Sequence, residues 1–241
     1  MAGSASAPAE AAPAPPQGSA AGSVRLLELD LASLRSRAYE AIRSSIITGE
    51  LAEDEIYPVS FFAARLGVSA TPIREALFDL AGDGLIEVVR NRGFKLPRLS
   101  ERDMDELHEL RLMVELPGVV RVAATGRLRE PRRLRQLALD LIELADRKDA
   151  VEYLTIDRAF HLELISGLEN QRLVRLVALL RDQARFRGIR RLAESGDLMS
   201  SAHEHLALLE VVAAGDVAGA ESAIRAHLAH TRLLWEGVVA R

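Results

Sequence analysis

The stretch GVSATPIREAL, residues 67–77, constrains the fold of this chain more than any other. A glycine turn comes first, then small hydroxyl residues and a proline, and then apolar residues at helical spacing. Ser69 or Thr71 can cap free backbone N–H groups, and Pro72 suits a first turn, where no N–H is needed. Arg74 falls on the side opposite the apolar stripe. The stretch predicts a helix that follows a tight turn and exposes an arginine near its start.

The flanking segments extend this into a recognisable order of elements. Apolar positions three and four apart over residues 34–47 predict a helix that Gly49 ends, and residues 59–66 predict a shorter helix that ends at Gly67. Residues 85–89 and 94–96 are β-prone on either side of the turn RNRG. Helix, helix, turn, helix and hairpin together predict a winged helix-turn-helix with a two-stranded wing.

The second half of the chain contains only helical patterns. Ser100 and Asp103 have capping-box-like spacing after a hinge, PRLSERD. The predicted helices are 101–125, 131–147, 150–166, 171–190, 200–214 and 217–239. Six helices with short connections predict an antiparallel all-α bundle. The fold class is therefore mainly α, with a disordered tail over residues 1–30, a winged domain over 31–99 and a helical domain over 100–241.

Composition excludes several classes of protein. The chain has no cysteine, so disulfides, thiolate zinc sites and cysteine nucleophiles are excluded. No apolar run reaches the roughly 18 residues of a membrane span, and the N-terminus does not read as a secretory signal. A cytoplasmic protein without membrane contact is the default expectation. The net charge of -4 gives no overall support for nucleic-acid binding, which must rest on a local basic cluster.

The winged domain carries such a cluster. A helix-turn-helix places the first residues of its second helix in the major groove, where Arg74 is long enough to reach a base edge or a phosphate. The hairpin adds Arg90, Arg92 and Lys95, and Gly93 allows close approach. These residues predict binding to double-stranded DNA. The alternative is a helical packing unit whose arginines are merely solvated.

One carboxylate and three imidazoles are predicted to face the interior of the bundle. Asp157 and His161 are four residues apart on one helical face, and His205 and His227 each share a face with apolar residues. Such a set suits a divalent transition metal, with zinc favoured and nickel or manganese as alternatives. An ordinary ion pair and hydrogen-bonded core histidines would give the same spacing.

Three segments, AIRSSIITGEL, RLGVSATPIREALFDLAGDGLIEV and NRGF, resemble the DNA-binding domain of GntR-family transcriptional regulators over about residues 34–97. The resemblance implies a set of contacts to operator DNA: Arg43 to phosphate, and Ser69, Thr71, Arg74, Arg92 and Gly93 to the duplex.

Two departures from the GntR pattern affect the expected operator. Ala70 stands where the family usually has an arginine that reads guanine, which implies a changed or less stringent operator. Glu53-Asp54 replaces the usual PG, and these carboxylates would weaken affinity for the DNA backbone if they face the duplex.

The segments DRAFHLELISGLENQRLVRL and HEHLALLEVVAAGDVAGAESAIRAHL resemble the FCD effector domain of FadR-type GntR regulators. In that family D...H, EH and HL supply the metal ligands. They correspond here to Asp157, His161, His205 and His227, and leave His203 and His230 outside. The first helix of the domain also fits the family's R..LE..AA pattern, at Arg111, Glu115, Ala123 and Ala124.

The FCD resemblance further implies a small carboxylate effector at the metal, with an arginine as a bidentate second contact. Arg111 is the first candidate for that contact, followed by Arg185 or Arg190; each could equally be a surface arginine. The predicted function is a metabolite-responsive transcriptional regulator. Two copies would form a homodimer that reads an inverted repeat, and the effector would change the affinity for DNA.

Two functions from other classes compete with this prediction. An Asp/His₃ site can activate water, as in a metal-dependent hydrolase, but hydrolysis usually needs a nearby general base. Helical phase is expected to turn the two nearby candidates, Glu163 and Glu204, away from the ligands. The other competitor is a ligand-binding or structural protein with a vestigial DNA-binding domain. Ala70 and the acidic pair Glu53-Asp54 favour it, whereas the basic residues Arg74, Arg92 and Lys95 count against it.

Overall fold

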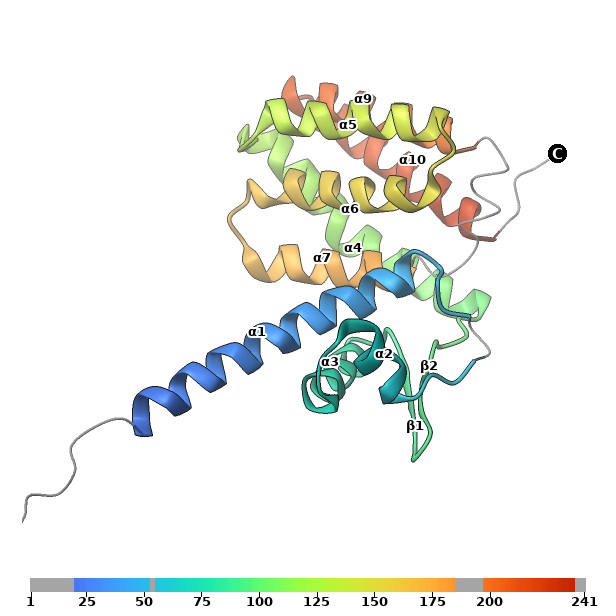
Figure 1. Cartoon of the computed structure of the whole chain (residues 1–241). Helices are drawn as coiled ribbons and strands as arrows, with labels where there is room; N and C mark the ends of the chain where they lie inside the picture. Colours follow the sequence, from blue (N-terminus) through green and yellow to red (C-terminus); the bar gives the residue numbers. More distant parts are fainter. Residues whose placement is uncertain (1–19, 53–54, 185–196, 237–241) are drawn as a thin grey trace, which may run out of the picture.

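The protein consists of two domains, seen here in a computed structural model (Figure 1). The structure describes residues 20–52, 55–184 and 197–236, with side chains over 33–52, 55–184 and 198–233. The N-terminal domain contains all the β-structure of these residues and lies below the helical domain in the figure. The predicted mainly α fold, with a winged domain followed by a bundle of about six helices, is confirmed.

Three helices and a hairpin form the N-terminal domain. They are α1 (Ala20–Ile47), α2 (Val59–Leu66), α3 (Ala70–Gly82), β1 (Glu87–Val89) and β2 (Gly93–Lys95). The sequence predicts a tail as far as residue 30, but α1 begins at Ala20, so that boundary lies inside a helix. The physical reason is the segment AAGSVRLLELDLA, which is rich in the strong helix formers Ala, Leu, Arg and Glu.

The turn between α2 and α3 follows from a glycine, as predicted. Gly67 ends α2 in the left-handed conformation, at φ 65°, which costs glycine little. Behind this turn Phe62, Ile73 and Phe94 are buried in one apolar core together with residues of α1. Burial of the α3 stripe turns the opposite side of the helix, including Arg74, toward solvent.

The wing is a short antiparallel hairpin. Val88 pairs with Phe94, and Phe94 also forms an isolated bridge with Tyr57. Gly93 has a φ of 137°, and a Cβ there would lie 2.0 Å from the carbonyl oxygen of Tyr57. Glycine at this position therefore lets the wing base pack directly on the backbone that precedes α2.

Six helices form the second domain: α4 (Glu101–Thr125), α5 (Pro131–Asp146), α6 (Ala150–Ser166), α7 (Gln171–Ala184), α9 (Asp197–Ala213) and α10 (Val217–Glu236). Ser100 starts α4 with a complete capping box, as its spacing from Asp103 predicts. The predicted helix 171–190 runs past Ala184 into residues outside the described chain. Within the described ranges, no helix is long and apolar enough to cross a membrane.

The bundle has one continuous apolar core, to which residues such as Leu141, Phe160, Leu208 and Ile224 contribute. Helices α4 and α10 pack together, α5 lies against α6 and α9, and α7 lies against α4 and α6. The C-terminal end of α7 lies beside α1 (Figure 1), so the two domains meet there.

Candidate metal centre and nucleic-acid interface

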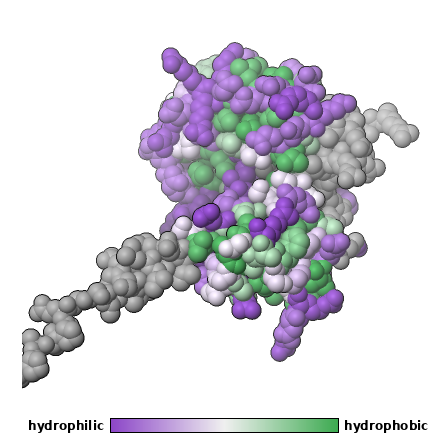
Figure 2. Space-filling model, viewed as in Figure 1, coloured by the Kyte–Doolittle hydropathy of each residue, from purple (hydrophilic) through white to green (hydrophobic). Residues whose placement is uncertain are grey.

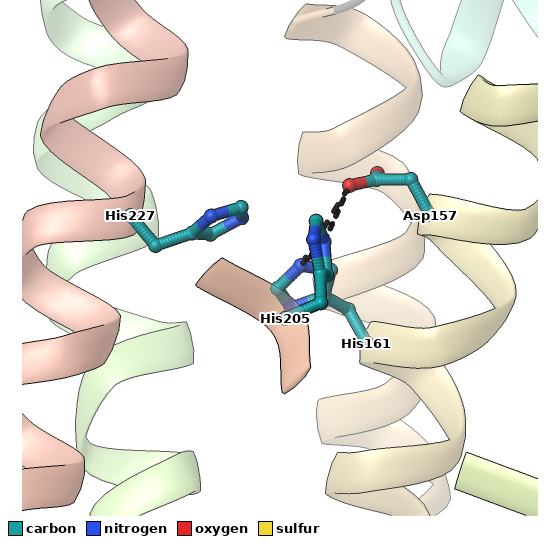
Figure 3. A group of neighbouring side chains, drawn as sticks. All are labelled: Asp157, His161, His205 and His227. Carbon is teal, nitrogen blue, oxygen red and sulfur yellow. Dashed lines mark hydrogen bonds and ion pairs between the residues drawn. The ribbon is translucent and has the colours of Figure 1, made fainter. Parts of the chain in front are cut away.

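Three helices bring one carboxylate and three imidazoles together inside the bundle. Asp157 and His161 come from α6, His205 from α9 and His227 from α10, and the four side chains converge (Figure 3). One ligand atom from each lies within 4.8 Å of the others. Asp157 is 7% exposed and the three histidines 0–1%. The prediction that all four face inward and lie close together is confirmed.

Ordinary helical packing positions these side chains. Asp157 and His161 lie on the buried side of α6 with Phe160 and Leu164. The same apolar core includes Leu208 and Leu209, which follow His205 in α9, and Ile224 and Leu228, which flank His227 in α10. Each ligand therefore occupies a position that an apolar side chain would otherwise fill. Burying polar groups is costly unless they find partners.

Hydrogen bonds fix two of the rings with Nε2 toward the centre. His205 Nδ1 lies 2.7 Å from the carbonyl oxygen of Ser201, and His227 Nδ1 lies 2.9 Å from Glu204 Oε2. Both Nδ1 atoms face acceptors, so in the neutral tautomer in which Nδ1 donates, each Nε2 keeps a lone pair. Nε2 of His227 has no hydrogen-bond partner among the described residues. A buried lone pair aimed at a carboxylate and two imidazoles is what a metal ligand requires.

His161 and His227 are held neutral, the form in which imidazole binds a metal. Burial, reinforced by the positive charge of Arg181, lowers the pKa of His161 well below its ordinary value. Burial, with the neighbouring His205, lowers the pKa of His227 to about 4. At neutral pH these two histidines are therefore uncharged and can donate a lone pair.

Two distances within the cluster are close to those around one small cation. His205 Nε2 lies 3.2 Å from His161 Nε2 and 3.0 Å from Asp157 Oδ1. Two atoms that each bind one zinc ion at about 2.0–2.1 Å lie about 3.3 Å apart in a tetrahedral site. In the neutral tautomer of His205 whose Nδ1–H is donated to Ser201, Nε2 meets the Asp157 carboxylate as a second acceptor. A shared cation would turn that unfavourable contact into a favourable one.

Glu204 corrects one sequence-based expectation. Helical phase predicts that it points away from the ligands, but its carboxylate accepts from His227 through Oε2 and from His230 Nδ1, at 2.6 Å, through Oε1. The glutamate side chain is long enough to cross from α9 to α10, which the phase of its own helix does not reveal. The other acidic candidate, Glu163, has its carboxylate 3.7 Å from the guanidinium of Arg133. His203 is exposed and faces the carbonyl oxygen of Met199, outside the cluster.

A buried array of charges adjoins the cluster. Arg181 of α7 donates to Asp157 Oδ2 at 2.8 Å and to Glu115 Oε2 at 3.0 Å, and Glu115 also accepts from Arg111. All four side chains are 7% exposed or less. Burial alone would raise the pKa of Glu115, but Arg111 and Arg181 outweigh burial and lower it. The array therefore holds Asp157 in place through a fixed guanidinium.

The arginines singled out from the sequence have different outcomes. Arg111 lies in the interior, 1% exposed, rather than on the surface. Arg185 and Arg190 lie outside the described residues. Arg181 was not anticipated. It shares the buried stripe of α7 with Val177, Leu180 and Ala184, so an arginine at an apolar helical position was the signal that could have revealed it.

The start of α3 is open to solvent. Ser69, Thr71 and Arg74 are exposed, whereas Pro72 is buried. Ser69 occupies the N-cap position in extended backbone, and its side chain makes no capping hydrogen bond. The first N–H groups of a helix lack intrahelical partners. This end of α3 can therefore offer N–H groups, hydroxyls and a guanidinium to an anionic backbone.

The wing tip is a second exposed basic element. Arg90 and Arg92 are exposed, and the tip projects from the domain as a hydrophilic feature with apolar areas behind it (Figure 2). Between the wing and α3 lies a groove of about 690 Å³ that includes Arg74, Arg92 and Gly93 in its lining. Three of the predicted DNA contacts thus border one surface, while Lys95 pairs with Glu87.

Arg43 lies elsewhere. Its guanidinium bonds Glu40 and Asp182 at the junction of the domains, and its side chain is 15% exposed. Glu53-Asp54, the departure that could weaken DNA affinity, lies outside the described residues. Ala70 is the first residue of α3, half-buried in the groove beside Arg74.

Comparisons with known proteins agree with this architecture. Residues 34–96 match the family described as bacterial regulatory proteins, gntR family, and residues 106–230 match the FCD domain. The chain is 30% identical over 203 residues to an HTH-type transcriptional regulator in an unstable DNA locus of Streptomyces ambofaciens, covering 80% of this chain and 81% of that protein. It is 28% identical over 198 residues to the transcriptional repressor GlaR of Escherichia coli strain K12, covering 79% and 90% respectively.

The fold also matches solved structures. E. coli McbR/YncC superposes with a TM-score of 0.73 at 22% identity, covering 81% of this chain and 93% of that one. The two matched domains together span most of the residues described above. A winged helix-turn-helix with an exposed α3, joined to an FCD bundle with a buried Asp/His₃ cluster, places the chain in a family of regulators rather than enzymes. This protein belongs to the GntR family of DNA-binding transcriptional regulators, in the FadR-like group with a C-terminal FCD domain.

Proposed function

We propose that this regulator binds one divalent transition metal at Asp157, His161, His205 and His227, and that a small carboxylate metabolite at this site modulates its affinity for DNA. The observation that carries the proposal is the cluster itself: four buried donors on three helices, with Nδ1 of His205 and of His227 turned toward acceptors outside the cluster. The donor set suits zinc first, with nickel or manganese as alternatives. A metal held there would supply a positive centre for a carboxylate oxygen.

Arginines near the cluster are the expected second contact for the effector. Arg111 and Arg181 lie beside Glu115 and Asp157 in the interior, so two guanidiniums already lie next to the cluster. Arg185 and Arg190 follow α7 directly in sequence and remain proposed contacts. A guanidinium binds a carboxylate through two parallel hydrogen bonds, which would add selectivity for that chemical class.

We propose that DNA recognition uses the start of α3 and the wing, and that two copies of the chain read an inverted repeat. Ser69, Thr71 and Arg74 would enter the major groove, and Arg92 with Gly93 would lie along the adjacent backbone or minor groove. Arg43 is kept as a proposed phosphate contact for a state in which its guanidinium is not held by Asp182.

Exposed apolar side chains on α4 and α7 support dimerisation. Met113 is 61% exposed and Leu176 43%, and both line a surface groove of about 480 Å³ together with Pro117 and Leu173. Apolar residues gathered on a surface mark protein–protein contacts more often than scattered ones do. We therefore place the homodimer contact on this face of the helical domain.

The variant Met113→Glu is expected to be a monomer, because it puts a charge into that contact. Light scattering after size exclusion, at about 10 μM protein, measures the mass. The wild-type protein should show twice the chain mass of 26.3 kDa, and the variant the single mass. Leu139→Glu on α5 is the control, since Leu139 is similarly exposed, at 43%, but does not line this groove. A monomeric wild type, or a variant that stays dimeric, contradicts the proposed interface.

One titration tests the function. The best duplex selected by the protein from a random-sequence pool is labelled, and fluorescence anisotropy compares it with a scrambled duplex at about 0.15 M salt. A preference of a hundredfold or more for the selected duplex is expected, with a symmetrical consensus. Adding Zn²⁺ and then a panel of small carboxylates should shift that affinity. Specific binding that neither Zn²⁺ nor any carboxylate alters would contradict the effector proposal and leave DNA recognition intact.

A further inference from the structure

Helices α6 and α7 are joined by two ion pairs that are formed by adjacent residues on each helix. Asp157 and Arg158 are consecutive on α6, and Arg181 and Asp182 are consecutive on α7. The inner pair joins Asp157 to Arg181 at 2.8 Å. The outer pair joins Arg158 to Asp182, also at 2.8 Å. The two pairs are linked through the backbone, because their members are neighbours along each helix.

The inner pair belongs to the candidate metal centre. Asp157 uses its two oxygens differently: Oδ1 lies 3.0 Å from His205, and Oδ2 accepts from Arg181. Arg181 also holds Glu115. A metal that binds Asp157, or an effector whose carboxylate binds Arg181, would therefore change the ion pairs that position Arg181.

The outer pair belongs to the contact between the domains. Asp182 accepts from Arg43 of α1 at 3.2 and 3.3 Å while it accepts from Arg158. The next residue, Gln183, donates to the carbonyl oxygen of Asp83, just after α3, at 2.7 Å. Asp182 is 3% exposed, so its carboxylate is shielded from solvent, and loss of both arginines would leave a buried charge without a partner.

We propose that residues 181–183 of α7 couple the metal and effector site to the DNA-binding domain, with Asp182 as the residue that transmits the change. A shift of Arg181 on ligand binding moves Asp182, its neighbour along the backbone. The bonds of Asp182 to Arg43 and of Gln183 to Asp83 then rearrange. These bonds position α1 and the end of α3, and so the reading face of the winged domain. The inference rests on the proposed function, because it names the residues through which occupancy of the metal and effector site would change the affinity for DNA.

The test compares full-length wild type with Asp182→Asn, which keeps the size of the side chain and removes its charge. The dissociation constant of the selected duplex is measured on metal-depleted protein and again with Zn²⁺. Coupling between two sites typically changes affinity about 5- to 150-fold. Wild type should change at least fivefold, in either direction, and Asp182→Asn less than twofold. Zn²⁺ affinity of the variant, measured by calorimetry, should stay within threefold of wild type.

Hydrogen exchange supplies a readout that needs no DNA. Zn²⁺ should alter the exchange of amides in residues 38–47 of α1 in the wild type and leave them unaltered in Asp182→Asn. Glu143→Gln is the matched control, because it removes one carboxylate from the surface of α5, far from this junction in sequence. It should behave as wild type in both assays.

The outcomes separate this inference from the proposed function. A wild type whose affinity for DNA ignores Zn²⁺ and carboxylates overturns both. If Zn²⁺ changes the DNA affinity of the wild type and of Asp182→Asn equally, only the route through α7 is overturned. If Asp182→Asn does not fold, Gln183→Ala takes its place: it removes the bond to Asp83, leaves the ion pairs, and should reduce the response at least threefold. An undiminished response in Gln183→Ala overturns the route as well.

Discussion

Replacing His205 with alanine is expected to abolish zinc binding. Wild-type protein dialysed against excess Zn²⁺ and then buffer should retain about one ion per chain by mass spectrometry, and His205→Ala less than a tenth of that. The variant loses the imidazole that lies within 3.2 Å of both His161 and Asp157. The loss should exceed the 10- to 100-fold that follows removal of a residue that only orients a ligand.

Heat denaturation gives an independent measure of the same prediction. Zinc at a thousand times its dissociation constant should stabilise the wild type by about 4 kcal/mol. For a chain of this length that corresponds to roughly 10 °C in Tm, at about 2–4 °C per kcal/mol. The Tm of His205→Ala should not respond to zinc.

Two further variants make the zinc experiment discriminating. His203→Ala removes an exposed histidine two residues away on α9, and it should retain full zinc content. Glu204→Gln keeps all four ligands but weakens the acceptor of His227 Nδ1–H, and its zinc affinity should fall about 10- to 100-fold. Equal zinc content in His205→Ala and wild type would show that the cluster is a hydrogen-bonded core and not a metal site.

Replacing Arg74 with alanine is expected to weaken binding to the selected duplex by about 5- to 150-fold, equivalent to about 1–3 kcal/mol. Arg74 is the exposed guanidinium nearest the start of α3 and borders the groove that faces the wing. Fluorescence anisotropy on selected and scrambled duplexes, repeated over a range of salt concentrations, measures the effect. Arg135→Ala, an exposed arginine of α5, is the control and should bind as wild type.

The pattern of loss reveals what Arg74 contacts. A base-edge contact predicts a loss confined to the selected duplex, with specificity relaxed at one position. A phosphate contact predicts equal weakening on both duplexes and a salt slope reduced by about one. Unchanged affinity on both duplexes would remove Arg74 from the interface and shift attention to the wing arginines.

Features set by local chemistry were predictable from the sequence. Gly67 required a left-handed turn, Ser100 and Asp103 formed the expected capping box, and the helical spacing of Asp157 and His161 placed both on one buried face. In each case the physical cause lies within about four residues along the chain. For the same reason, the periodicity of apolar residues predicts most boundaries of the bundle helices to within a few residues of those in the structure.

Features that depend on contacts between distant segments were not predictable in this way. The burial of Arg181 is not predictable, because a charged residue on a helix is expected at the surface and its partners Glu115 and Asp157 lie on two other helices. Glu204 was expected to point away because helical phase says nothing of the neighbouring helix. The pairing of Arg43 with Asp182 joins residues 139 positions apart, which no local spacing encodes.

The array of Arg111, Glu115 and Arg181 has a consequence for engineering this fold. Buried ion pairs often contribute less to stability than apolar side chains of the same volume, by about 1–4 kcal/mol. Directed evolution for heat tolerance alone would therefore tend to replace these three residues with leucine or methionine. The resulting regulator would be more stable to heat and would keep its DNA-binding residues. It would, however, lack the Arg181 guanidinium that holds Asp157. If the proposed function holds, variants selected for thermostability alone are expected to lose the response of DNA binding to a carboxylate effector.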